Sequence, residues 1–350
     1  MFEDLLKYAL KNGASDIHIT VGVPPTARIN GNLVPIGSKK LDTTDTEAIV
    51  EEVLKKEHLE EYRQRGEIDL SYSVKGLGRF RVNVYRQRGS SSMALRVVAL
   101  RVPTLGELGL PEAVAELAGK TRGLVLVTGP TGSGKSTTLA AMIDLINSER
   151  NCHILTLEDP IEYLHKHNKS IVNQREIGYD SRTFASGLRS ALRQDPDVIL
   201  VGEMRDLETI STAITAAETG HLVLSTLHTV GADKTIDRII DVFPPYQQQQ
   251  IRVQLSTVLQ GVISQNLINS RDGKKRVLAV EVMIATPAIR NLIRAGKTHQ
   301  IITSMQTGGK YGMQTMDAAL AKLCKDGLIK HESALMYCSS EETLMKFLGK

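Results

Sequence analysis

A glycine-rich segment contains a lysine and a serine side by side, and these two side chains could bind phosphate and a metal ion. The segment runs from Gly129 to Thr137, reads GPTGSGKST, and directly follows the apolar run 124–128. Its glycines let successive N–H groups turn toward phosphate oxygens, and the helical pattern at 138–147 places a helix N-terminus, with its positive potential, beside them. Lys135 can reach the β- and γ-phosphates, and Ser136 can bind Mg²⁺.

The segment therefore predicts a binding site for a nucleoside triphosphate. A chance glycine- and serine-rich turn is the alternative, which the preceding strand and the following helix disfavour. The candidate nucleotide-binding residues are Gly129, Pro130, Thr131, Gly132, Ser133, Gly134, Lys135, Ser136 and Thr137.

A carboxylate follows a second apolar strand, where it could activate water. The run 197–201 reads DVILV and continues into Gly202 and Glu203. Hydrolysis of a phosphoanhydride needs a group that positions or deprotonates water, and Mg²⁺ needs further oxygen ligands. Gly202 occupies the place where many nucleotide hydrolases have the metal-binding Asp, so we expect Glu203 to activate water or to contact the metal through water. The alternative is a capping carboxylate after a buried strand.

A second acidic cluster follows the apolar strand 153–157. Carboxylates at the carboxyl end of a parallel strand lie at the edge of the sheet where phosphates bind. Glu158 is the candidate to orient water or metal, whereas Asp159 and Glu162 could equally cap the loop, and capping is favoured for Glu162.

Two histidines flank a further strand, 222–227. His221 precedes it and His228 follows it. A histidine near a γ-phosphate could sense the nucleotide by hydrogen bonding. A structural role is the alternative for each.

One stretch of the chain is basic and free of acidic residues. From Leu70 to Gly106 it contains Lys75, Arg79, Arg81, Arg86, Arg88, Arg96 and Arg101 but neither Asp nor Glu. A solvated strand face normally mixes both charges, so this stretch favours an anionic partner. Nucleic acid is one possibility, but few aromatic side chains are present to stack on bases. The other is nucleotide phosphate, bound by arginine fingers of this subunit or of a neighbour.

The composition is that of an ordinary globular protein. The chain has 350 residues, of which 41% are hydrophobic and 23% charged, a net charge of +4 and three cysteines without metal-ligand spacing. The charge is too small to indicate nucleic-acid binding. No apolar run is long enough to span a membrane, and the first residues lack a signal-peptide pattern, so we expect a cytosolic, reduced chain.

The pattern of expected strands, helices and turns around these motifs predicts two domains. Residues 1–100 begin with a short amphipathic helix that ends at Asn12-Gly13. Short strands then alternate with turns, including a hairpin at Asn30-Gly31, and a second helical stretch is expected at 45–65, which together suggest a small α+β domain. Residues 101–111, rich in Pro and Gly, are the expected linker. From 112 to 350 we expect an α/β domain, with parallel strands at 124–128, 153–157, 197–201 and 222–227 and a mostly helical chain after Pro244-Pro245.

The motifs together resemble those of the secretion and type IV pilus ATPases. GPTGSGKST is similar to their Walker A segment, and LTLEDPIEY (155–163) to their acidic box. LRQDPDVILVGEMRD (192–206) is similar to their atypical Walker B segment, and TGHLVLSTLHT (219–229) to their histidine box. GASDIHI (13–19) and RFRVNVYRQRG (79–89) look like the PAS-like domain of this family.

A further segment resembles the retraction members of the family. It reads AIRNLIR and comprises Ala288, Ile289, Arg290, Asn291, Leu292, Ile293 and Arg294. Taken alone, it is an amphipathic helix in which Ile289, Leu292 and Ile293 pack while Arg290, Asn291 and Arg294 face outward. A role in pilus retraction is implied only by the resemblance.

The resemblance implies a RecA-like ATPase core with a PAS-like domain, assembled as a homohexamer that uses ATP and Mg²⁺. Arg81 and Arg96 match the family's arginine fingers. The implied function is retraction of type IV pili, and hence twitching motility, by a cytoplasmic ring at the inner membrane that acts on the platform protein of the pilus machine. An accessory retraction paralogue, which would also be a partner, and a nucleic-acid translocase are the alternatives, although a nucleic-acid partner is not expected.

Overall fold

The structure is a computed structural model that describes residues 2–74, 76–98 and 101–349. Lys75, one of the basic residues noted above, lies outside the described residues. The contacts divide the chain into two compact units, one formed by Met1–Arg101 with Glu162–Leu164 and the other by Val102–Ile161 with His165–Lys350.

The first unit contains a six-stranded antiparallel sheet in the order β3-β2-β1-β6-β5-β4. Its strands are β1 (Ala14–Ile19), β2 (Thr26–Ile29), β3 (Asn32–Pro35), β4 (Glu67–Val74), β5 (Gly78–Gln87) and β6 (Ser90–Val97). Its helices are α1 (Phe2–Lys11), α2 (Thr43–Val53) and α3 (Lys56–Arg65). Alternation along β5 buries Phe80, Val82 and Val84 in the core of this unit.

Local chemistry explains the turns of the first unit. Asn30 (φ 50°) and Gly31 (φ 83°) both lie in the left-handed region, as a tight two-residue hairpin turn requires, so the predicted hairpin between β2 and β3 is confirmed. The single helix expected at 45–65 is wrong. Two helices occur there, because Leu54 adopts an extended conformation, and the first of them is capped by the side chain of Asp42.

The second unit contains a seven-stranded sheet in the order β13-β12-β7-β11-β10-β8-β9. Its strands are β7 (Gly123–Thr128), β8 (His153–Glu158), β9 (Ile171–Glu176), β10 (Val198–Val201), β11 (Leu222–Leu227), β12 (Leu259–Asn269) and β13 (Arg276–Ile284). All neighbours are parallel except β12 and β13, which form an antiparallel pair. The expected α/β class and the four expected parallel strands are confirmed.

Helices cover both faces of this sheet. They are α4 (Glu112–Ala118), α5 (Lys135–Glu149), α6 (Phe184–Ala191), α7 (Leu207–Glu218), α8 (Ala232–Asp241), α9 (Pro245–Val258), α10 (Pro287–Arg294) and α11 (Ile301–Gln306), with one-turn 3-10 helices at Thr298–Gln300 and Gly309–Tyr311. Because successive side chains of a strand point to opposite faces, Leu124 and Leu126 of β7 pack with α7 and α9, while Val125 and Val127 pack with α4 and α5.

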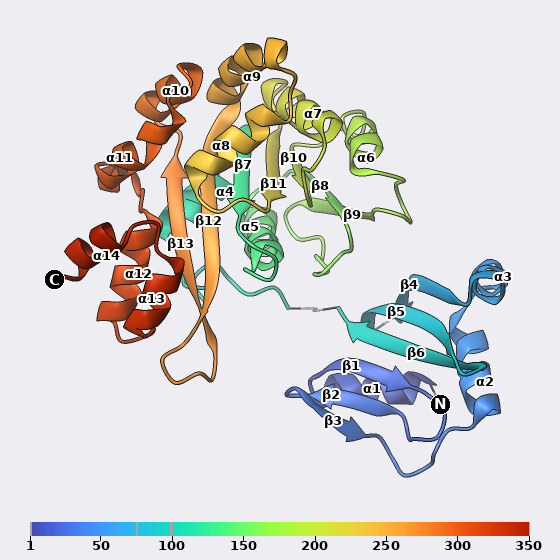
Figure 1. Cartoon of the computed structure of the whole chain (residues 1–350). Coiled ribbons are helices and arrows are strands. Elements are labelled where there is room, and N and C mark those ends of the chain that lie inside the picture. The colour runs from blue at the N-terminus through green and yellow to red at the C-terminus, as the bar shows by residue number, and fades with distance from the viewer. Residues whose placement is uncertain (1, 75, 99–100, 350) are drawn as a thin grey trace. The chain divides into compact units, whose positions relative to one another are not determined.

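The expectation of a mostly helical chain after Pro244-Pro245 is wrong for residues 259–284. The long strands β12 and β13 occupy this segment, and β12 lies between β7 and the edge strand β13 (Figure 1). Helices return only from α10 onward and end in α12 (Met316–Lys325), α13 (His331–Tyr337) and α14 (Glu341–Leu348). These last three helices share a small core with Ile268 and Ala279 of the two strands.

A buried carboxylate connects the sheet to two helices. Glu281 of β13 is 1% exposed, and its two oxygens accept hydrogen bonds from the backbone N–H groups of Ala232 (2.8 Å) and Met316 (3.1 Å), the first residues of α8 and α12. Burial raises the pKa of Glu281, although the two backbone donors oppose this effect. Glu281 thus holds two helix N-termini on the sheet.

None of the helices in the described ranges is both long and apolar enough to cross a membrane.

Candidate functional site

The glycine-rich segment lies between β7 and α5, as predicted. Gly129 (φ 141°), Gly132 (φ 78°) and Gly134 (φ 89°) adopt conformations that other residues rarely adopt. A Cβ atom on Gly129 would also lie 2.3 Å from the backbone oxygen of Gln265. The segment therefore requires glycine for its shape, and the N-terminus of α5, a 15-residue helix, begins at Lys135 directly behind it. This geometry suits an anion.

Lys135 is nearly buried and reaches back across its own loop. Its ammonium donates hydrogen bonds to the backbone oxygens of Gly129 (2.8 Å) and Pro130 (3.1 Å). These bonds place its positive charge inside the curve of the loop, where a phosphate group would meet it. Ser136, by contrast, is exposed at the first turn of α5.

Gln265 of β12 supports the loop through two side-chain hydrogen bonds. Its side chain is fully buried, donates from Nε2 to the backbone oxygen of Ser133 (2.8 Å) and accepts at Oε1 from the hydroxyl of Thr138 (3.0 Å). The neighbouring Ser264 points to the other face, where its hydroxyl accepts from the N–H of Gly231 (3.0 Å). Strand β12 thus contacts both the glycine-rich loop and the loop after β11.

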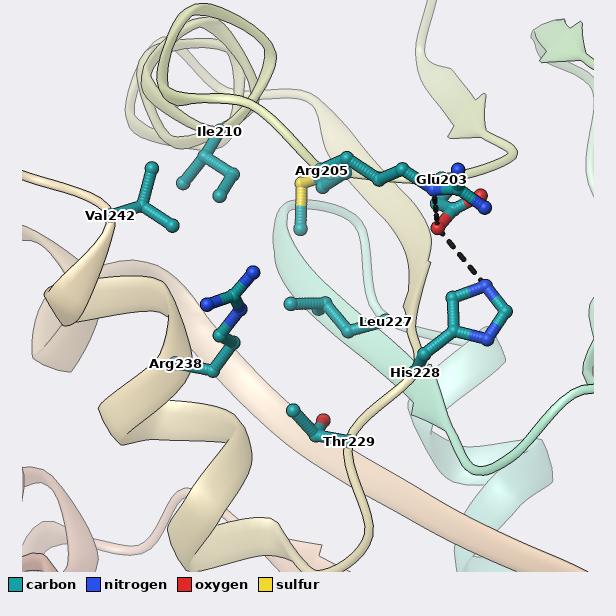
Figure 2. A pocket seen from close by; sticks show the side chains of 9 residues that line it. Glu203, Arg205, Ile210, Leu227, His228, Thr229, Arg238 and Val242 are labelled. Carbon is teal, nitrogen blue, oxygen red and sulfur yellow. Dashed lines mark hydrogen bonds and ion pairs between the residues drawn. The ribbon is translucent and has the colours of Figure 1, made fainter.

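Glu203 and His228 meet at the carboxyl edge of the sheet. Figure 2 shows them facing one another, with His228 Nε2 3.0 Å from Glu203 Oε1. The other ring nitrogen, Nδ1, lies 3.5 Å from the hydroxyl of Thr131 in the glycine-rich loop. Arg205 donates to the same Glu203 oxygen, and this bond raises the pKa of Arg205. The structure therefore brings Glu203, His228 and the loop together, as the sequence suggested.

Gly202 is small because its surroundings are crowded. Its N–H donates to the backbone oxygen of Leu157 (2.8 Å), and a Cβ atom on Gly202 would lie 3.1 Å from that same oxygen. Any side chain here would press on strand β8. A Cβ atom would fit only if the neighbouring backbone shifted by a few tenths of an ångström, so the close strand packing favours glycine over Asp at this position, and Glu203 is the next carboxylate along the chain.

A pocket of about 380 Å³ lies behind the Glu203–His228 pair. Ile210, Leu227 and Val242 form much of its apolar lining, and the guanidinium of Arg238 points into it (Figure 2). Glu203 and His228 also belong to its lining, so the pocket adjoins the candidate site.

Glu158 ends β8 at the same edge of the sheet. Its Oε1 accepts from the hydroxyl of Thr156 (2.6 Å) and from Nε2 of Gln174 (3.0 Å). Strands β11 and β10 separate β8 from β7, which puts their axes about 14 Å apart. Glu158 thus lies farther from the glycine-rich loop than Glu203 does.

The expected position of His221 near a γ-phosphate is wrong within this domain. His221 precedes β11, and its backbone oxygen accepts from the N–H of Gly123, which begins β7. Because β7 and β11 are parallel, His221 lies at the opposite edge of the sheet from the glycine-rich loop, about 20 Å from His228. Its Nδ1 donates to the backbone oxygen of Ala216 (2.9 Å), a structural role.

The two candidate arginine fingers are neighbours on the first unit. Arg81 of β5 and Arg96 of β6 pair across the two strands and share the exposed face of that sheet. Arg96 donates to Asp16 (2.9 Å). Burial raises the pKa of Asp16, but the hydrogen bond from Ser15 and the pairing with Arg96 outweigh it, so the pKa is lowered overall.

The AIRNLIR segment forms α10, but the amphipathic pattern predicts the wrong exposure for one residue, Arg290. Ile289 and Ile293 are fully buried, and Asn291 and Arg294 are exposed, as expected. Arg290, expected to face outward, is instead half-buried. It donates to the backbone oxygens of Ser256 and Thr257, both at 2.6 Å, at the end of α9, and to that of Ala285 (2.9 Å).

Four buried polar residues were not predicted from the sequence: Gln265, Thr138, Ser264 and Glu281. All four are polar and at most 1% exposed. The signal was weak: three of them lie in strands whose polar residues interrupt the usual apolar pattern, and Thr138 looks like an ordinary helical residue. Polar residues inside an otherwise apolar run could have indicated buried hydrogen bonds.

Comparison with known proteins extends these observations. Residues 1–326 match the family described as type II/IV secretion system protein. A protein of Pseudomonas aeruginosa named "type IV pilus retractation ATPase PilT" is 50% identical over 331 residues, which are 95% of this chain and 96% of that protein. The type IV pilus ATPase PilU of the same organism is 42% identical, over 98% of this chain and 90% of that protein.

A solved structure shows the same fold. The crystal structure of the pilus retraction motor PilT with bound ADP superimposes with a TM-score of 0.90 at 50% identity, and each chain is covered to 98%. The matched family covers the first unit and the second unit as far as residue 326, including the glycine-rich loop and the Glu203–His228 pair. The chain is therefore a member of the type II/IV secretion system protein family.

Proposed function

We propose that this protein is a motor ATPase that powers the retraction of type IV pili, and with it twitching motility. The observation that carries the proposal is the contact network in which Glu203 and His228 join the glycine-rich loop through Thr131. A phosphate-binding loop and a water-positioning carboxylate at one sheet edge are groups that hydrolysis of a bound nucleotide needs, and a histidine beside them can respond to the γ-phosphate. The relative named for pilus retraction supplies the specific process.

The proposed cofactors are ATP and Mg²⁺. Residues 129–137 would bind the phosphates, with Lys135 between the β- and γ-phosphates. The exposed hydroxyl of Ser136 and the carboxylate of Glu203, directly or through water, would contact Mg²⁺, which would neutralise charge on the phosphates. ADP is bound in the solved retraction motor to which this chain is similar.

Each side chain at the edge has a proposed role in the reaction. Glu203 would orient the attacking water and accept its proton, and His228 would hold Glu203 and respond to the γ-phosphate. Glu158, farther along the edge, would help to order water. Arg81 and Arg96 would act as arginine fingers that stabilise charge on the transferred phosphoryl group.

The proposed assembly is a homohexamer. Its proposed parts are a PAS-like domain (1–100), a linker (101–111) and a RecA-like domain (112–350). The ring would work on the cytoplasmic side of the inner membrane, and its proposed partners are the platform protein of the pilus machine and a paralogous retraction ATPase. Residues 288–294 would contribute to retraction through the exposed positions of α10.

The biochemical test is ATP hydrolysis by the purified chain with and without DNA. We expect Mg²⁺-dependent hydrolysis that DNA does not stimulate. Strong stimulation by DNA would instead favour a nucleic-acid translocase. Absence of hydrolysis under all conditions would contradict the proposed enzyme.

The cellular test is deletion of the gene. Loss of retraction leaves cells with surface pili but without twitching, whereas loss of assembly removes the pili. We expect piliated, immobile cells. If the mutant still twitches, and stops only when a paralogue is also deleted, the chain is an accessory retraction ATPase.

A further inference from the structure

We infer that Gln265 is a positioning residue for the nucleotide, because it holds the Ser133–Gly134 peptide of the glycine-rich loop in the orientation that binds a β-phosphate. The inference rests on the proposed nucleotide-binding function and adds a residue outside the loop to it. Gln265 lies on β12, more than a hundred residues from the loop in sequence.

Gln265 sets the orientation of one peptide bond of the loop. Gln265 Nε2 donates to the backbone oxygen of Ser133 at 2.8 Å, so this oxygen points toward β12. In a planar trans peptide the C=O of one residue and the N–H of the next point in opposite directions. The N–H of Gly134 is thereby turned away from β12, toward the inside of the loop, where such N–H groups bind phosphate oxygens.

The side-chain amide of Gln265 is itself held in one orientation by Thr138. The Thr138 hydroxyl donates to Gln265 Oε1 at 3.0 Å, so the oxygen of the amide faces α5 and its nitrogen faces Ser133. Thr138 is 1% exposed and Gln265 is fully buried, so water cannot replace either bond. Leaving a buried polar group without its partner costs the free energy of its desolvation, so both hydrogen bonds of the Gln265 amide are retained.

The glycine-rich loop also packs closely against β12 at Gln265. A Cβ atom on Gly129 would lie 2.3 Å from the Gln265 backbone oxygen, and one on Gly134 would lie 3.3 Å from Gln265 Nε2. The two glycines at the ends of the bend therefore both pack on Gln265. One residue of β12 thus supports the loop through its backbone and through its side chain.

The test is nucleotide affinity of the full chain measured by calorimetry with ATP, ADP and AMP. Gln265→Leu replaces the amide by an apolar side chain of similar size and so removes the donor to Ser133. We expect ATP and ADP to bind about tenfold more weakly, the size of one lost hydrogen bond. AMP has no β-phosphate, so its affinity should stay within about twofold.

Two further variants distinguish positioning from general damage. Gln260→Leu is the matched control, because Gln260 lies on the same strand and also donates to a backbone oxygen, that of Arg122 (3.2 Å), away from the loop. It should leave all three affinities unchanged. Thr138→Val should weaken ADP less than Gln265→Leu does, and the double variant should equal Gln265→Leu alone, because both changes disrupt one network.

If Gln265→Leu does not fold, Gln265→Met decides the matter. Met has an unbranched side chain of similar length but offers Ser133 no donor at any pH, so we expect the same loss for ADP and not for AMP. Unchanged ADP affinity in a folded Gln265 variant, or equal weakening of ADP and AMP, would overturn this inference alone. A wild-type chain that bound none of the three would overturn the proposed function as well.

Discussion

At the scale of single residues, the carboxylate of Glu203 is the group around which the site is arranged. Its Oε1 accepts a hydrogen bond from Arg205 and lies 3.0 Å from His228 Nε2, and its side chain is only 20% exposed. Both groups contact the same oxygen and so restrict the orientation of the carboxylate, which is what a water-orienting carboxylate requires. Lys135 plays the corresponding part for phosphate, because its ammonium is already inside the loop.

Replacing Glu203 tests its catalytic role. Glu203→Gln should bind ATP with unchanged affinity but hydrolyse it about 100-fold more slowly or worse, because the amide cannot accept a proton. Single-turnover hydrolysis and ATP binding measured together will show this. Glu208→Gln, at an exposed position on α7, is the control and should behave as wild type. Equal rates for wild type and Glu203→Gln would remove Glu203 from the reaction.

Replacing Lys135 tests the phosphate site. Lys135→Ala removes a charge-assisted contact, so ATP affinity should fall by at least about tenfold. Binding titrations with ATP provide the measurement. Lys120→Ala, exposed before β7, should bind ATP normally. Normal ATP affinity in Lys135→Ala would mean that the loop does not bind the nucleotide.

At the scale of elements, polar side chains attach helices and loops to β12 and β13. Gln265 and Ser264 contact the two loops of the site, and Glu281 holds the N-termini of α8 and α12. Arg290 likewise attaches α10 to the carbonyl end of α9, where a positive charge is favourable.

The buried carboxylate predicts a pH dependence of stability. Because the pKa of Glu281 is raised in the folded chain, its stabilising contribution is complete below the unfolded pKa of about 4.3 and is lost as pH rises through the folded pKa. The stability difference between wild type and Glu281→Gln in urea unfolding should therefore shrink as pH rises above the unfolded pKa of about 4.3. Glu116→Gln, exposed on α4, should show a constant difference. A constant difference for Glu281→Gln as well would contradict this assignment.

Helix α10 allows a stability effect to be separated from a motor effect. Arg290→Ala should lower the free energy of unfolding by about 1–2 kcal/mol, because the carbonyls at the end of α9 lose their donors. Asn291→Ala and Arg294→Ala, at exposed positions, should change it by less than about 0.5 kcal/mol. Of these, Asn291→Ala should spare hydrolysis in the purified chain and impair twitching in cells. Loss of both activities together would make the position merely structural.

At the scale of the whole molecule, the proposed ring makes a prediction about mixtures. Arg81→Ala should be inactive because the finger is missing, and Lys135→Ala because the nucleotide is not bound. If the finger acts on a neighbouring subunit, mixed rings will contain some sites with an intact Lys135 from one variant and an intact Arg81 from the other. Hydrolysis by mixtures should then exceed that of either variant alone. No recovery at any ratio would count against action between subunits.

The sequence by itself determined the phosphate loop, the α/β class and the parallel strands that lead to Glu203, Glu158 and His228. Local rules suffice for these features, because glycine conformation, strand periodicity and the polarity of parallel strands depend on neighbours in the chain. The predicted parallel direction of 222–227 also implies that His221, which precedes this strand, lies at the far edge of the sheet, so its expected place near the γ-phosphate conflicted with the predicted sheet itself.

Only the tertiary structure decided which polar residues support the site. Strand β12 was missed because Ser264 and Gln265 interrupt its apolar pattern, and they can be buried there only because loops distant in sequence supply their hydrogen-bond partners. Arg290 was placed outward by periodicity for the same reason, since its acceptors belong to α9. A buried hydrogen bond depends on where two distant segments meet, and this position is not encoded in the pattern of either segment alone.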